Sequence, residues 1–145
     1  VNTSVSIAAV PEAVSARVAR QVILADPTTH CHVRMLEAVL GKRLVNPRDM
    51  PAQIERLREI ARQDNVTMRF IPTGTKLNVA PYHGFEVLDD RVVMVDLYSS
   101  SVRTSGPRDV ALYREVFAKL DESATDDIDA ILDKHLEIYL DLSRP

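Results

Sequence analysis

The sequence predicts a single α+β domain in which amphipathic helices flank a small antiparallel sheet. Three observations favour this class. Between Asn65 and Tyr98 the chain holds three runs with the two-residue alternation of strands. Helical spacing of apolar residues recurs on both sides of that segment. A length of 145 residues with 46% hydrophobic content is the size of one ordinary domain. We therefore expect residues 1–145 to form one domain around one core.

The first predicted helix covers Glu12 to Leu24. Pro11 precedes it, and proline suits the first turn of a helix. On one side Arg17 and Arg20 lie three residues apart and are therefore neighbours, which either face solvent or pair with a buried acid. The other side carries an apolar stripe of valines spaced four residues apart, at Val10, Val14, Val18 and Val22.

A strand is predicted from His30 to Leu36, with apolar and polar residues on opposite faces. Cys31 falls on the apolar face, where a thiol is usually inert. A single cysteine forms neither an internal disulfide nor a redox pair, so the cysteine count favours the reducing cytoplasm. The sequence contains neither a signal-peptide pattern nor a membrane-spanning apolar stretch, and we expect no membrane partner.

Glu37 continues the apolar face of this strand and would point a carboxylate toward the core. A buried charge is costly unless it is paired or hydrogen-bonded. Two explanations stay open. Residues 38–40 could form a short helical turn, ending at Gly41, whose N-terminal amides bind the acid. Alternatively, Glu37 forms an ion pair with helix one, with Arg20 preferred over Arg17.

A second helix begins at Pro51, after a loop over 46–50, and its apolar stripe comprises Ile54, Leu57, Ile60 and Ala61. Three strands of the central sheet follow, over 66–71, 85–88 and 91–98. Asp89 and Asp90 connect the last two as a tight hairpin, although the usual glycine is missing. Val92 to Leu97 is apolar on both faces, which predicts an interior strand and, because both faces need cover, a homodimer.

Two long loops, over 72–84 and 99–107, border the hairpin, and loops of such length are often functional. A third helix is predicted from Pro107 to Leu120. A fourth begins at residue 126 or 127 and reaches Tyr139, with aspartates where the helix dipole favours them. The tail from Leu140 to Pro145 is expected to fray.

Polar and aromatic residues at the strand ends and in the two long loops could line one pocket. For binding, arginines would hold a carboxylate or phosphate while aromatic rings supply apolar contact. For catalysis, Asp96 or His83 would act as general acid or base with a pKa moved toward neutrality. The alternative is a scatter of surface residues. The predicted ligand-binding residues are Arg69, Tyr82, Phe85, Tyr98 and Arg103.

Several function classes are disfavoured. A net charge of -3 argues against nucleic-acid binding by the chain alone. His30 and His32 could turn toward one ion, but third ligands are distant in sequence, so we expect no metal and no cofactor. The four glycines are not spaced as a phosphate loop, and neither Cys31 nor the serines at 99–101 lie in a nucleophile elbow.

A series of short motifs follows in order from helix one to the end of helix three. They are Arg17-Val18-Ala19-Arg20-Gln21, Leu36-Glu37-Ala38-Val39-Leu40-Gly41, and the segments 53–57, 66–72, 84–88, 93–96 and 110–120. In these motifs the chain resembles the C-terminal effector domain of actinobacterial antitoxin-like transcriptional regulators, where an Xre-type helix-turn-helix precedes this domain of unknown function.

The resemblance implies an α+β effector domain that acts through a small molecule or a partner regulator protein. It singles out Arg20, Glu37 and Asp96, where the family usually carries glutamate, and it adds no catalytic residue. The helix-turn-helix and the segment that normally links it to helix one are absent from this sequence. The alternatives are an excised domain, a free-standing relative that binds a regulator or small molecule, or a small biosynthetic enzyme of specialised metabolism.

Overall fold

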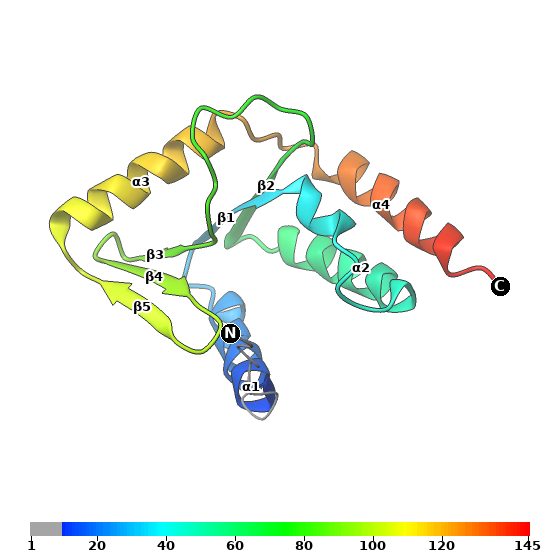
Figure 1. Ribbon diagram of the computed structural model, residues 1–145, viewed down its shortest axis with the longest axis horizontal. Coiled ribbons are helices and arrows are strands. Elements are labelled where there is room, and N and C mark those ends of the chain that lie inside the picture. Colours follow the sequence, from blue (N-terminus) through cyan, green and yellow to red (C-terminus); the bar gives the residue numbers. More distant parts are fainter. Residues whose placement is uncertain (1–9) are drawn as a thin grey trace, which may run out of the picture.

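The computed structural model describes residues 10–145, with side chains from Val14 onward, and confirms the α+β class. The side chain of Val10, the first valine of the expected stripe, lies outside the described part. Figure 1 shows the elements in order. The helices are α1 (Val10–Arg20), α2 (Met50–Ala61), α3 (Pro107–Asp121) and α4 (Ile128–Leu142), with 3-10 turns η2 (Gln21–Ala25), η3 (Glu37–Gly41) and η4 (Pro47–Asp49). The strands are β1 (Cys31–Leu36), β2 (Val66–Ile71), β3 (Glu86–Leu88), β4 (Val92–Asp96) and β5 (Ser101–Thr104).

The strands form two small sheets rather than one, so the prediction that 66–71 belongs to the antiparallel sheet is wrong. β2 pairs in parallel with β1, in a register that places Cys31 opposite Val66. Parallel strands need a crossover of about a dozen residues or more, usually helical. The segment from η3 through α2 supplies that crossover. On its other edge β2 exchanges two backbone hydrogen bonds with Thr125, at 3.2 and 2.7 Å from Phe70.

The antiparallel sheet has the order β3-β4-β5, so β4 is the interior strand that its apolar sequence predicts. Asp89 and Asp90 make the hairpin turn, both with positive φ, 50° and 53°. Two central residues with positive φ are the geometry of a type I′ turn, which aspartate tolerates. The expected loop over 99–107 contains β5, which lies at the exposed edge of the sheet and therefore lacks an apolar pattern.

Two helices depart from their expected bounds. The first α-helix ends at Arg20 and continues as the 3-10 turn η2. α4 continues to Leu142, so the expected fraying from Leu140 is wrong. The hydroxyl of Ser143 donates a 2.7 Å hydrogen bond to the Tyr139 carbonyl and satisfies one of the free acceptors at that helix end.

The core lies between α2, α4 and the parallel pair, and α2 and α4 lie side by side in Figure 1. α3 extends from the antiparallel sheet to the parallel pair and contacts strands of both. Ile54, Phe70 and Leu132 are 0% exposed. The hydroxyl of Tyr139 donates to the carbonyl of Leu40, which attaches α4 to η3.

Replacement of Leu132 by alanine should lower the free energy of unfolding by about 2–5 kcal/mol, because it removes a fully buried side chain from α4 and leaves a cavity. Leu140→Ala is the matched control, since Leu140 lies on the same helix but is 47% exposed. Its change should stay within about 0.5 kcal/mol in urea unfolding. Equal losses for both variants would contradict this placement of the core.

Candidate functional site

Glu37 is 3% exposed and binds three groups from segments far away in sequence. Its carboxylate accepts hydrogen bonds from the backbone N–H of Thr73 at 2.8 Å, from His135 Nε2 at 3.0 Å, and from Lys134 Nζ. The expected partner Arg20 does not make this contact, because α1 is attached to the end of β4 while α4 packs over η3. Arg20 instead lies 3.0 Å from Asp96.

The three donors determine the ionisation of Glu37. Burial alone would raise the pKa of this carboxyl group. The hydrogen bonds from Lys134, Thr73 and His135, together with the positive charge of Lys134, outweigh burial and lower the pKa to about 2. Glu37 is therefore ionised in the folded protein at neutral pH and acts as a structural clamp between η3, the segment after β2, and α4.

Arg69, predicted to bind an anionic ligand, is bonded to aspartates of the chain itself. Its guanidinium lies 2.6 Å from Asp121 and forms an ion pair with Asp126 at 2.8 Å. Arg34, its register partner on β1, also binds Asp121. The hydrogen bond that Arg69 donates to Asp121 raises the pKa of Arg69, and desolvation by burial opposes this effect. These contacts join the parallel pair to the end of α3. The Arg69 guanidinium is therefore used within the chain rather than for a ligand.

His83 and Asp96, the two candidate acid-base residues, are bound by different helices. His83 Nδ1 donates to the Gly84 carbonyl at 3.1 Å, and in a neutral ring that leaves Nε2 to accept from the Tyr113 hydroxyl at 3.2 Å. Phe85 packs edge-on against the same Tyr113 ring, with centroids 4.9 Å apart. Asp96 lies at the end of β4, where it binds Arg20 of α1.

The remaining predicted ligand residues are separate from these clusters. Tyr82 is 90% exposed, and Tyr98 is 98% exposed in the turn between β4 and β5. Arg103 is exposed on the edge strand β5, opposite Met94. The structure thus brings together His83 and Phe85, and it distributes the other predicted residues over different surfaces.

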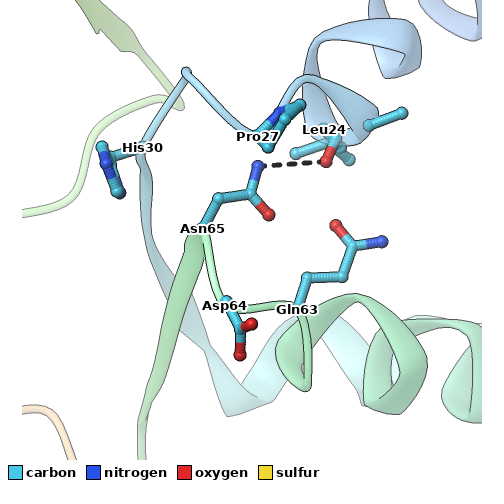
Figure 2. A pocket seen from close by; sticks show the side chains of 7 residues that line it. Leu24, Pro27, His30, Gln63, Asp64 and Asn65 are labelled. Carbon is cyan, nitrogen blue, oxygen red and sulfur yellow. Dashed lines mark hydrogen bonds between the residues drawn. The ribbon is translucent and has the colours of Figure 1, made fainter.

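A pocket of about 390 Å³ lies instead where η2 meets the end of α2 (Figure 2). We call it the junction pocket. One wall is apolar, and the other carries the polar residues that follow α2. Its lining comprises Leu24, Ala25, Pro27, His30, Gln63, Asp64 and Asn65.

Asn65 holds the two walls of the junction pocket together. Its Nδ2 lies within hydrogen-bond distance of three backbone carbonyls, those of Leu24 at 3.2 Å, Asp26 at 3.1 Å and Thr29 at 3.0 Å. The side-chain nitrogen of Asn65 is therefore used in hydrogen bonds to the backbone of η2 and the loop after it. This use of the nitrogen leaves the Asn65 oxygen turned toward the pocket (Figure 2).

Gln63 contributes a second carbonyl oxygen to the junction pocket. Its Oε1 is buried and has no hydrogen-bond partner among the described residues. In Figure 2 the side-chain oxygens of Gln63 and Asn65 are turned toward the space between them. Buried acceptors without a partner are rare in folded proteins. With Asp64 at the border, the pocket presents acceptors and negative charge, so it suits a ligand that donates N–H groups.

The sequence did not indicate this pocket, because Gln63, Asp64 and Asn65 have the composition of an ordinary turn. Asp121, Lys134 and His135 were also missed as partners. One signal was available for His135, which lies on the apolar stripe of its helix and is 8% exposed. A polar residue at such a position needs a buried partner.

His30 and His32 do not belong to a larger cluster of ligating residues. From residue 10 onward, no group of three or more histidine, cysteine, aspartate or glutamate side chains is arranged to hold a metal ion. Over the same part of the chain, no helix combines the length and apolar character needed to cross a bilayer.

Comparison with known proteins identifies one family. A family model described as Domain of unknown function (DUF5753) matches residues 2–131. No curated protein and no solved structure matches the chain. The matched range contains Glu37 and the junction pocket, whereas Lys134 and His135 lie beyond it.

The ionisation of Glu37 should make stability depend on pH in a defined window. Its pKa is about 2 in the folded protein, against 4.5 for an ordinary glutamate side chain. The ionised form is therefore favoured by folding, and the contribution is complete above pH 4.5 and is lost as pH falls toward 2. We expect Glu37→Gln to lower the free energy of unfolding by about 3 kcal/mol at pH 7.

Urea unfolding at several pH values checks this expectation. The difference between wild type and Glu37→Gln should shrink between pH 4.5 and 2. The exposed Glu137→Gln, on α4, is the control and should differ little from wild type at any pH. A constant difference across this window would show that Glu37 is not the depressed acid described here.

Proposed function

We propose that this chain, which belongs to the family described as Domain of unknown function (DUF5753), is a non-catalytic effector domain that binds a small ligand in the junction pocket. One observation carries the proposal: the buried Gln63 oxygen has no partner among the described residues, and it borders a pocket beside the Asn65 oxygen. A ligand N–H group between these oxygens would satisfy both.

The ligand class follows from the lining. Small-molecule pockets measure about 300–1,000 Å³ and combine apolar walls with a few polar groups, and the junction pocket has this size and composition. Leu24, Ala25 and Pro27 would contact a carbon skeleton. Asp64 adds negative charge, which favours a cation. We propose a small amine or amidine with several N–H donors, in contrast to the anion expected for a site built on Arg69.

Binding at this place could be transmitted to α1. One wall of the pocket belongs to η2, the direct continuation of α1, and the other follows α2, which packs in the core. A ligand that contacts both walls favours the arrangement in which α1 is held against the body. Ligands shift such an equilibrium by their difference in affinity for the two states.

The resemblance to Xre-type regulators supplies the biological setting of the proposal. In such a regulator the effector domain would transmit ligand binding to a helix-turn-helix. That helix-turn-helix would be carried by the same protein or by a partner regulator in the cytoplasm. The net charge of -3 supports a division of labour in which DNA contacts come from elsewhere.

The alternative of a biosynthetic enzyme finds less support. An acid and a base that act on one substrate must both reach it. His83 bonds Tyr113 of α3, while Asp96 binds two arginines of α1. This arrangement favours binding over acid-base catalysis.

Thermal-shift titrations test the ligand proposal. Benzamidine and agmatine should raise the melting temperature as their concentration increases. At a ligand concentration of 100 times the dissociation constant, the free energy of unfolding should be higher by about 2.7 kcal/mol. Benzoate, an anion of similar shape to benzamidine, should have no effect. Gln63→Leu should remove the response, whereas Gln53→Leu, at an exposed position of α2, should keep it. If neither cation stabilises the protein, or if both variants respond alike, the proposal is wrong.

Gel-shift assays test whether the chain needs another DNA-binding module. Because the chain is acidic, we expect no salt-sensitive binding to duplex DNA below micromolar concentration. Sub-micromolar binding that weakens steeply with salt would contradict this division of labour.

A further inference from the structure

The first helix and the turn after it present an apolar surface. Apolar residues that recur at helical spacing usually face the core of a domain, but here they are exposed. We call this surface the α1 surface. It consists of Val14, Val18, Val22 and Ile23, with exposed fractions of 52%, 58%, 72% and 48%.

The α1 surface lies on a different side of the helix from the arginines that bind the antiparallel sheet. Arg20 and Arg17 lie 3.0 and 3.9 Å from Asp96 and attach the helix to the end of β4. At about 100° per residue, Val14 and Val18 are rotated by about 110° from the two arginines. Figure 1 shows α1 projecting from the sheets, away from α3 and α4. The ion pairs thus position the helix while its valines stay uncovered by the described residues.

Two further apolar side chains are exposed in the turn after β4. Leu97 and Tyr98 follow directly after Asp96 and are 50% and 98% exposed. Single exposed apolar residues are normal, but contiguous groups mark interaction sites. The Asp96 ion pairs attach this turn to the arginine side of α1, next to the α1 surface in sequence but on a different side of the helix.

The total surface of the chain exceeds that of a compact monomer of the same mass. It is 10598 Å² for a mass of 16.2 kDa, whereas a compact monomer of that mass exposes about 7,500 Å². An extended segment with the mass of residues 1–9 would account for at most about 1,400 Å² of the difference. About 1,700 Å² remains, and obligate dimers bury about 1,000–2,500 Å² per subunit.

We propose that the α1 surface binds the α1 surface of a second copy of this chain, with the two helices antiparallel. The sequence spacing of the stripe is symmetric about Val18, so a two-fold axis there places Val18 against its own copy and Val14 near Val22, which lies in the 3-10 turn η2. Such an isologous contact is the commonest form of association in homo-oligomers. The arginines are bound to Asp96 on another side of the helix, so no like charges meet across the pair.

Antiparallel packing also sets the N-terminus of each helix beside the C-terminus of the other, which the helix dipoles favour. This inference goes beyond the proposed function and is independent of it, because no residue of the α1 surface lines the junction pocket.

Light scattering and sedimentation test the association. At tens of micromolar, wild type should show twice the 16.2 kDa chain mass. Val18→Glu, which would place two charges at the centre of the contact, should weaken association at least about 30-fold and give the monomer mass. Leu44→Glu, at an 85% exposed position distant in sequence, should remain a dimer. Circular dichroism should show that both variants are folded.

Cysteine cross-linking tests the geometry. Under mild oxidation Val18→Cys should form a covalent dimer, as should a mixture of Val14→Cys and Val22→Cys chains. The wild type, which keeps Cys31, should not. A monomeric wild type, a dimer that survives Val18→Glu, or a different protein held on the α1 surface of a monomeric chain would each overturn the proposal. Loss of ligand response with an intact dimer would instead count against the proposed function alone.

Discussion

The buried carboxylate of Glu37 is the constraint on which the main body of this protein depends. It joins the end of β1, the segment after β2 and helix α4, and the Tyr139 hydroxyl adds a second polar contact between α4 and η3. A buried charge must be matched by donors in fixed positions. Because Lys134, His135 and the Thr73 amide supply them together, α4 can dock over η3 in one register. The core between α2, α4 and the parallel pair is built around this docking.

Outside that body, α1 has a different kind of attachment. Exposed ion pairs to Asp96 hold it at one end, and the Asn65 hydrogen bonds hold the loop that follows η2. Exposed ion pairs contribute little to stability, typically below about 1 kcal/mol. The structure therefore combines a well-packed body with a helix that is easily repositioned. A ligand at the junction and a second copy on the valine stripe would both act on this weakly held element.

Much of the fold could be predicted because its signals are local. Proline and aspartate mark the starts of α3 and α4, and the two aspartates mark the hairpin. The strand over 66–71 was also visible, but its pairing was not, because parallel or antiparallel partners are decided by contacts between distant segments. Short β5 is an edge strand with little burial, so it lacks a pattern.

The candidate site was less predictable for the same reason. Alternation placed Glu37 on the buried side, yet nothing in the sequence distinguishes Lys134 from Arg20 as its partner. The sequence left Arg69 free to bind a ligand, whereas in the structure α3 places Asp121 beside it. Backbone amide shifts on titration with benzamidine test the central claim most directly. We predict that the shifts concentrate at residues 24–30 and 63–65. Shifts confined to His83, Phe85 and Tyr113, or to the Arg69 cluster, would contradict the account.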